Sequence, residues 1–155
     1  MAIRNAAKAI ILHEGKILVN RCITDNNEVY FDLPGGGQNQ FETMEEAVIR
    51  EVLEETGYKV KIIRFLALAE EINDNKEQRD KYLDYSHRIL HVFLVQLESE
   101  NAAEITEKDL QQEESVWISI EEIDNIPFRP RQLTGKITDL IHVSFPQYLG
   151  CIREC

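Results

Sequence analysis

The stretch from Gly36 to Tyr58 constrains this chain most, because it joins a helix signal to acidic residues on the apolar side of that helix. Thr43-x-x-Glu46 has the form of a capping box, which predicts a helix beginning at Thr43. Gly57 suits the left-handed residue just past the helix end. At about 100° per residue, one face collects Met44, Ala47, Val48 and Val52 together with Glu51 and Glu55, and Glu54 lies at its edge. The pattern predicts an amphipathic helix whose apolar side carries carboxylates.

Carboxylates in this position are costly. They lose hydration, and a pair at 4 Å repels by roughly 4 kcal/mol at an effective dielectric of 20. They also lie in the last turn, where the helix dipole favours cations. We therefore expect Glu51, Glu54 and Glu55 to meet a divalent cation. Mg²⁺ is the expected ion, with Mn²⁺ as a substitute, because Mg²⁺ is normally shared between carboxylates and substrate phosphates. The alternative is an acidic helix end that only faces water.

A glycine run, Gly35-Gly36-Gly37, precedes the helix and follows the strand-like segment 29–33. Glycines between a strand and a helix let the backbone approach a ligand closely, so Gly36 and Gly37 are candidate substrate-binding residues. The run and the helix together match the Nudix box, Gly-x5-Glu-x7-Arg-Glu-U-x-Glu-Glu-x-Gly-U, where U is a bulky apolar residue. The matching residues are Gly36, Glu42, Arg50, Glu51, Val52, Glu54, Glu55 and Gly57, with Tyr58 at the last U position. The chain therefore resembles the MutT-like Nudix hydrolases. It departs from many of them at 38–41, where a Pro-Gly pair is usual, and at Tyr58, where an aliphatic residue is more usual.

Length and composition indicate one domain, residues 1–155, with the box at 36–58. A net charge of −11 argues against a broad nucleic-acid-binding surface. No window is apolar enough to span a membrane, and the first residues lack the apolar core of a secretory signal. The three cysteines do not suggest a disulfide framework. We expect a cytoplasmic protein with a small-molecule nucleotide substrate, without a membrane or nucleic-acid partner, and leave a homodimer open.

The pattern along the chain predicts an α/β fold. Strands are predicted at 6–12, 16–21, 29–33, 60–71, 86–97 and 116–118, and 148–155 as an edge strand. Helices are predicted at 43–56, at 121–126 after a second capping box, Ser119-x-x-Glu122, and from Pro130 onward. The segment 86–97 is apolar on both faces, which indicates a central strand covered on both sides. The Nudix resemblance implies the same architecture, a mixed β-sheet sandwiched between helices (an α/β/α sandwich).

The resemblance also implies a reaction. Nudix enzymes hydrolyse a pyrophosphate bond in a nucleoside diphosphate linked to another group X, releasing a nucleotide and a phosphorylated product. The resemblance also implies that Glu51, Glu54 and Glu55 are metal ligands, and that the backbone carbonyl of Gly35 is a further ligand. Arg50 is assigned to the catalytic site as a support that pairs with Glu54 four residues on, and Glu42 supports the same network. Glu51 is favoured as the general base, with the alternative Glu113 or Glu114.

Substrate choice lies outside the box. The segment 73–84 is predicted to be a loop over the site, and Tyr82 and Tyr85 are candidates to stack on a nucleobase. The sequence does not name the group X. Two other functions stay open, a nucleotide-binding or sensor module that does not cleave its ligand, and an RNA 5′-end pyrophosphohydrolase, which would need a basic RNA path that the net charge disfavours.

Overall fold

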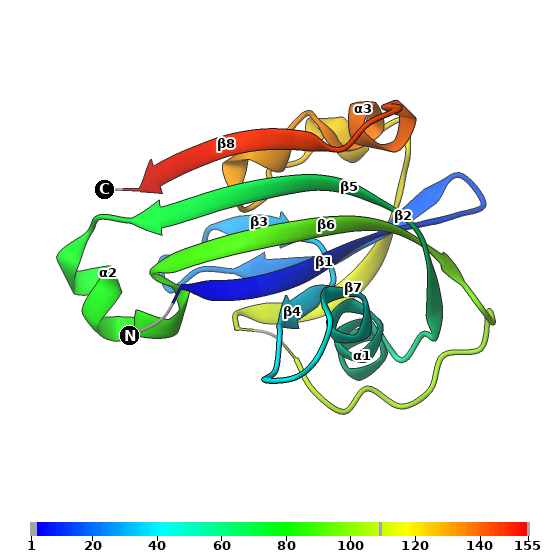
Figure 1. The fold of residues 1–155 in the computed structure, drawn as a ribbon, viewed down its shortest axis with the longest axis horizontal. Coiled ribbons are helices and arrows are strands. Elements are labelled where there is room, and N and C mark those ends of the chain that lie inside the picture. Colours follow the sequence, from blue (N-terminus) through cyan, green and yellow to red (C-terminus); the bar gives the residue numbers. More distant parts are fainter. Residues whose placement is uncertain (1–2, 109, 155) are drawn as a thin grey trace.

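Figure 1 shows the computed structural model, which describes residues 3–108 and 110–154. Within these residues an eight-stranded mixed sheet forms the body of the molecule. The strands are β1 (Arg4–His13), β2 (Lys16–Ile23), β3 (Val29–Asp32), β4 (Gly35–Gly37), β5 (Val60–Asn73), β6 (His87–Leu97), β7 (Gln112–Ser119) and β8 (Gln147–Glu154). The helices are α1 (Met44–Thr56), α2 (Lys76–Lys81) and α3 (Ile137–His142), with the 3-10 helices η1 (Leu83–Tyr85), η2 (Ile123–Asn125) and η3 (Arg131–Leu133).

The sheet follows the order β3-β2-β1-β6-β5-β8, with β4 added to β1 and β7 added to β2. Strand β1 changes its neighbour along its length, because it pairs with β2 at residues 11–13 and with β4 at residues 6–8. Strand β2 pairs with β7 along residues 16–22, and with β3 at residues 20–23, beyond its pairing with β1. The short glycine strand β4 was not predicted as a strand, because a run of glycines has no strand pattern.

The strands predicted at 6–12 and 16–21 form the antiparallel β1–β2 hairpin. Glu14 and Gly15 form a two-residue turn with φ angles of 48° and 72°, the backbone of a type I′ turn. The turn fixes the register that pairs His13 with Lys16. The first two strands therefore follow from local turn chemistry.

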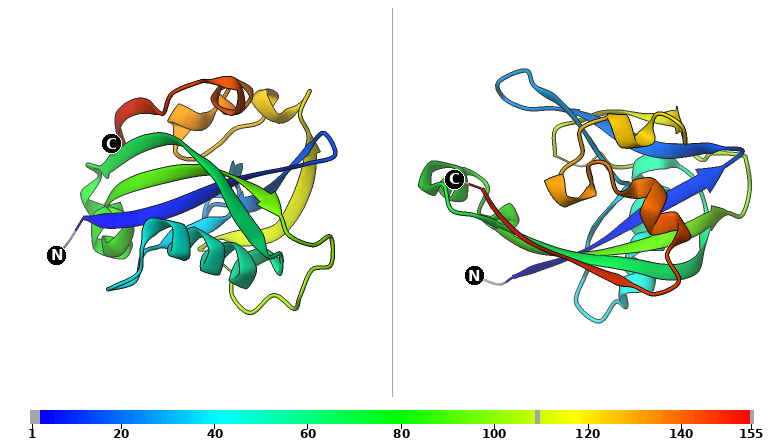
Figure 2. Two further views of the ribbon diagram at one scale, coloured as in Figure 1. Left: turned by 45° about the vertical axis from the view of Figure 1, so that its right-hand side comes forward. Right: turned by 90° about the horizontal axis from the view of Figure 1, so that it is seen from above.

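Strand β6 is central, as predicted, because it lies between β1, to which it is parallel, and β5, to which it is antiparallel. Val92 belongs to a buried cluster that includes Ile123, Leu133 and Ile137 from η2, η3 and α3. Phe93, on the other face, belongs to a cluster that packs on α1. Figure 2 shows α1 on one face of the sheet and the C-terminal helices on the other. The α/β/α sandwich is confirmed, with few and short helices.

Two helix predictions are wrong in detail. The second capping box does not form, because Ser119 is still paired with Lys16 as the last residue of β7 and makes no side-chain cap. Only the short η2 follows it. The final helix is split into η3 and α3, with Gly135 at a φ of 73° between them. The apolar residues Leu133, Ile137 and Leu140 of this segment are nevertheless buried.

The segment 73–84 also contains more structure than the predicted loop. Helix α2 begins after Asn75, whose side chain accepts a hydrogen bond from the backbone of Gln78, and η1 follows it. The predicted edge strand near the C-terminus is confirmed as β8, which pairs parallel to β5. Residue 155, the last of the predicted strand, lies outside the described residues.

Candidate active site

Helix α1 has both predicted caps. The Thr43 hydroxyl accepts from the backbone of Glu46, and the Glu46 carboxylate accepts from the backbone of Thr43, which completes the capping box. Gly57 ends the helix with a φ of 78°, and its N–H donates to the carbonyl of Leu53. The last turn contains no basic residue. The helix therefore presents its negative end and its box carboxylates together.

Strand β4 lies beside this helix and brings side chains against two of its glycines. A Cβ atom at Gly36 would lie 2.5 Å from Oε2 of Glu51. A Cβ atom at Gly37, on the other face of β4, would lie 2.8 Å from Nη2 of Arg4. These two glycines were predicted to make room for a substrate, and the space that they leave is taken by Glu51 and Arg4. Their contact with substrate stays a prediction.

Glu55 is a buried carboxylate, with only 2% of its surface exposed. Its Oε2 accepts hydrogen bonds from Nδ2 of Asn20 at 2.9 Å and from the backbone N–H of Gly35 at 3.1 Å. Asn20 in turn accepts a hydrogen bond from the Ser115 hydroxyl through its Oδ1. Side chains of β2 and β7, which lie outside the box, thus hold Glu55 in position through hydrogen bonds.

Arg50 connects the other acids of the box. Its Nη1 donates to Oε1 of Glu51 at 2.7 Å and to Oε2 of Glu54 at 3.1 Å, which confirms the predicted pair with Glu54. Its Nε and Nη2 donate to the two carboxylate oxygens of Glu42 at 2.6 and 2.9 Å. Nη2 also donates to the carbonyl of Gly37. The Arg50 hydrogen bonds lower the pKa of Glu42, and Glu42 foremost raises the pKa of Arg50.

The pKa of Glu51 shifts in the opposite direction from that of Glu42, although both carboxylates contact Arg50. Burial raises the pKa of Glu51 above its ordinary value, against the lowering effect of Arg50. The alternative bases, Glu113 and Glu114, are exposed residues of β7. Glu51 is therefore the candidate base that already lies among the other box carboxylates, although its role stays a prediction.

A buried ion pair lies directly behind the glycine strand. Nζ of Lys8 donates to Oδ2 of Asp32 and to the carbonyl of Gly35, both at 3.0 Å, and Lys8 is 1% exposed. The sequence contains one signal for this ion pair, a single lysine in the apolar run 6–12, and none for its partner Asp32. The predicted metal contact of Gly35 would thus require a carbonyl oxygen that serves the ammonium group of Lys8 and the cation at once.

A pocket of about 130 Å³ opens beside this ion pair, and Asp32 forms part of its wall. The predicted substrate residues Tyr82 and Tyr85 line it, together with Tyr30, Glu71, Asn73, Gln78, Arg88, Leu110, Gln111 and Arg129. Asp32 contacts Lys8, Lys8 contacts Gly35, and Gly35 contacts Glu55. The pocket is therefore joined to the box carboxylates through a short series of hydrogen bonds.

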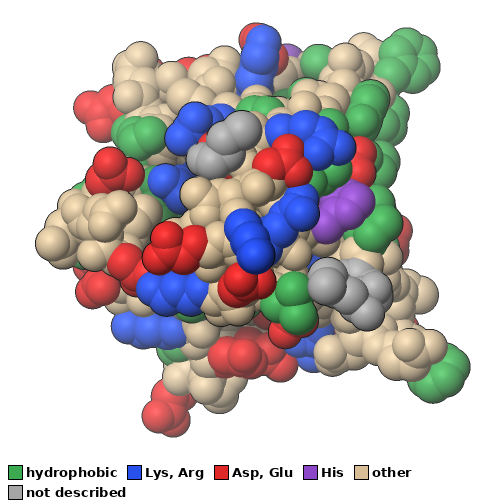
Figure 3. Space-filling view, turned by 90° about the vertical axis from the view of Figure 1, so that its left-hand side faces the viewer, with side chains coloured by type: hydrophobic (Ala, Val, Ile, Leu, Met, Phe, Trp, Pro, Cys, Tyr) green, Lys and Arg blue, Asp and Glu red, His purple; other side chains and the backbone are tan. Residues whose placement is uncertain are grey.

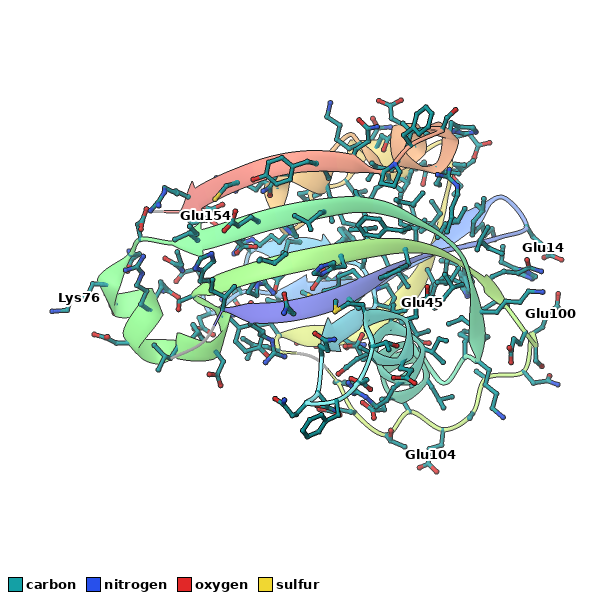
Figure 4. The ribbon with its side chains drawn as sticks, viewed as in Figure 1. Glu14, Glu45, Lys76, Glu100, Glu104 and Glu154 are labelled. Atoms are coloured by element: carbon teal, nitrogen blue, oxygen red, sulfur yellow. The ribbon has the colours of Figure 1, made fainter. Side chains whose placement is uncertain are left out.

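A second group of possible ligand atoms lies at the other end of the sheet. His13, Glu14 and Glu100 have side-chain ligand atoms within 4.8 Å of one another. Figure 4 shows Glu14 and Glu100 near the β1–β2 turn, away from Lys76 and Glu154 at the α2 end. Both glutamates are exposed. We do not treat this surface group as part of the candidate active site.

The NUDIX domain family model matches residues 2–137. The chain belongs to this family. Its fold is also similar to solved Nudix structures. One is a MutT NUDIX hydrolase from Burkholderia pseudomallei, with 22% identity, a TM-score of 0.61, and coverage of 88% of this chain and 98% of that one.

Two further neighbours carry substrate names. A UDP-X diphosphatase has 20% identity and a TM-score of 0.65, over 96% of this chain and 67% of that one. An ADP-ribose pyrophosphatase from Streptococcus suis has 18% identity and a TM-score of 0.62, over 97% of this chain and 100% of that one. At these identities the likeness establishes the fold. No helix among the described residues is long and apolar enough to cross a membrane.

The donor set of this Nudix box fits a hard divalent cation. Glu51 and Glu54 bond the same nitrogen of Arg50, and Glu51 and Glu55 contact neighbouring residues of β4. Carboxylate oxygens are the ligands that Mg²⁺ and Mn²⁺ prefer. One arginine also leaves the acids of the last turn with excess negative charge. The residues of this site therefore match the metal that the family implies.

Proposed function

We propose that this Nudix protein is a Mg²⁺-dependent hydrolase that cleaves a pyrophosphate bond in a nucleoside diphosphate linked to another group X. The proposal takes residues 1–155 as a single catalytic domain. The observation that carries it is the complete acidic end of α1, where Glu51 and Glu54 share one nitrogen of Arg50 and the buried Glu55 accepts from Gly35 of β4. A binding module without chemistry would not need to maintain three acids in this costly position.

The three glutamates would hold the cation. When bound, a divalent cation supplies positive charge for the phosphate oxygens and lowers the pKa of a water molecule. Arg50 orients Glu51 and Glu54 through one nitrogen, and Glu42 holds Arg50 from the other side. Arg50 is therefore proposed as a positioning residue, consistent with its full set of protein partners.

Glu51 is proposed to accept the proton of the attacking water at Oε2. Oε1 of Glu51 accepts a hydrogen bond from Arg50. Oε2 of Glu51 lies against Gly36, in the space that a side chain at residue 36 would fill. Burial also raises the pKa of Glu51, which makes its carboxylate a stronger acceptor for the proton of water. The pocket beside Asp32 would receive the part of the substrate on one side of the scissile bond. The neighbours named as a UDP-X diphosphatase and an ADP-ribose pyrophosphatase support a substrate with two such parts.

A metal-dependent screen tests the proposal. The protein is incubated with nucleoside triphosphates, ADP-ribose, dinucleotides and sugar nucleotides in Mg²⁺, in Mn²⁺ and in EDTA. We expect turnover of at least one compound with metal and none in EDTA. Glu45→Gln is a matched control, because Glu45 lies on the same helix but is exposed. If one compound binds with metal but none turns over, the chain is a sensor module and the proposal fails.

A further inference from the structure

The tyrosines of the pocket are covered by cations. The guanidinium of Arg129 lies 4.7 Å from the ring centroid of Tyr30. The guanidinium groups of Arg4 and Arg88 lie 4.8 and 5.7 Å from the ring centroid of Tyr85. These distances fall within the range of cation–π contacts. The rings therefore serve as platforms for arginine side chains.

The same holds for the third tyrosine of the wall. Nζ of Lys81 lies 5.0 Å from the ring centroid of Tyr82, and the Tyr82 hydroxyl donates to Asp25, which also pairs with Lys81. A nucleobase would have to share or displace these contacts in order to stack. The ring contacts thus favour a different ligand from the nucleobase that the sequence suggested.

Arginine stacked on an aromatic ring keeps the donors at the edge of its guanidinium available. These N–H groups match the geometry of phosphate oxygens and bind them in pairs. The chain carries a net charge of −11, yet Arg88 and Arg129 line one pocket, and Arg4 lies over the ring of Tyr85 in its wall. Figure 3 looks onto the end of the molecule that carries α2, where Lys and Arg side chains cluster among acidic ones. The described lining residues include two acids, Asp32 and Glu71, and two arginines, so this wall is less acidic than the whole protein.

The acids of the wall already have cationic partners. Asp32 pairs with Lys8 at 3.0 Å, and Glu71 pairs with Arg88 at 2.8 Å. Arg4, in contrast, makes no ion pair with a carboxylate among residues 3–108 and 110–154. Because Asp32 and Glu71 are neutralised by these partners, they do not repel an anion strongly. Arg4, without such a partner among the described residues, can attract an anion.

Arg129 adds a second such charge. Its only ion pair within the part of the chain that the structure describes is to Glu28, at 3.9 Å, and the Glu28 side chain is 72% exposed. An ion pair this long and this exposed to water contributes little. Arg129 lines the pocket and can therefore turn toward an anion there.

Arg4 also links the pocket to the box. Its guanidinium occupies the side-chain space of Gly37, whose carbonyl accepts a hydrogen bond from Arg50. The two arginines thus contact the same glycine from different sides. The pocket volume of about 130 Å³ is small beside the roughly 300–1,000 Å³ of sites that enclose whole drug-sized ligands, and suits a phosphate group.

We propose that Arg4 and Arg129, supported on Tyr85 and Tyr30, form an anion subsite that binds a phosphate of the group X. This inference rests on the proposed hydrolase function. It names the substrate class as nucleoside polyphosphates, or other diphosphate esters in which X itself is anionic. Neutral sugars as X would not use the subsite.

The first test compares substrates whose X differs in charge. ATP and adenosine tetraphosphate have an anionic X, whereas ADP-ribose and ADP-glucose have a neutral one. We expect the double variant Arg4→Gln/Arg129→Gln to raise KM for the first pair by about tenfold or more, the loss of about 1.4 kcal/mol of binding, and to change KM for the second pair by less than about threefold. Lys61→Gln is the control, because it also removes one positive charge per substituted residue, at an exposed position of β5. Equal effects on both pairs would overturn the subsite.

The second test does not depend on hydrolysis. Binding of tripolyphosphate to the protein in EDTA is measured by calorimetry at low salt. We expect binding in the wild type and in Lys61→Gln, weakening by about tenfold in the double variant, and partial retention in Arg4→Lys/Arg129→Lys, which keeps the charge but loses the planar donors. If tripolyphosphate binds and no nucleotide turns over, the hydrolase proposal fails and the subsite stands. If nucleotides turn over and tripolyphosphate does not bind, the subsite fails alone.

Discussion

Gly36→Ala should impair catalysis by moving one carboxylate. Gly36 does not have a left-handed φ, so alanine introduces no backbone strain there. Its Cβ would, however, lie 2.5 Å from Oε2 and 2.6 Å from Cδ of Glu51. Ordinary contact begins at 3.4 Å, so the Glu51 carboxylate must retreat by about 1 Å.

The retreat would break the geometry that Arg50 imposes on Glu51. A misplacement of about 1 Å in a reacting group can cost roughly a hundredfold in rate. Overpacking of this kind typically costs about 1–3 kcal/mol of stability, which corresponds to a fall in Tm of roughly 2–12 °C for a domain of this size. We therefore expect kcat to fall by about a hundredfold in a protein that is still folded at 25 °C.

The assay is steady-state hydrolysis of the best substrate from the screen, with Mn²⁺ binding followed by electron paramagnetic resonance. Gly37→Ala is the paired control, because its Cβ would meet the flexible end of Arg4 and not a box carboxylate. That variant should raise KM more than it lowers kcat. If Gly36→Ala keeps kcat within about threefold of the wild type, the placement of Glu51 against β4 has no catalytic importance.

Other variants test the remaining assignments. Glu55→Gln should lower kcat by at least about a hundredfold and weaken Mn²⁺ binding, while thermal unfolding without metal stays unchanged or improves, because like-charge repulsion is relieved; full activity of this variant, or of the wild type in EDTA, would remove the metal from the mechanism. Glu51→Gln should lower kcat much more than it raises KM, and a thousandfold fall in Glu113→Gln or Glu114→Gln with Glu51→Gln nearly unaffected would move the base to β7. Burial lowers the pKa of His91, so its neutral form is favoured in the folded state and stability should fall as the pH drops below about 6.5; denaturant unfolding between pH 5 and 8 should show a weaker pH dependence in His91→Gln, and an unchanged dependence would exclude His91 as its source.

Local patterns predicted most of the elements and the placement of the box glutamates on α1. The hairpin at Glu14-Gly15, the capping box at Thr43 and the left-handed Gly57 each depend on residues within four positions of one another, which a sequence displays directly. The pair of Arg50 with Glu54 is of the same kind. The failed capping box at Ser119 has a local form as well, but strand pairing with Lys16 prevented it.

The supports of the site come from distant parts of the chain. Asn20 reaches Glu55 across 35 residues, and Lys8 reaches Asp32 and Gly35 across 24 and 27. Such contacts depend on the pairing of β1 with both β2 and β4, which no local sequence pattern specifies.

The pocket shows the same division. Tyr82 and Tyr85 could be singled out as aromatic residues in a polar segment, but the cations that cover them could not. Arg4 reaches Tyr85 only because β1 pairs in parallel with β6, where it faces Arg88. Helix and turn signals act through neighbouring residues, whereas the charge of a pocket depends on strand order. The composition therefore indicated an acidic protein, although the folded chain places arginines at this wall.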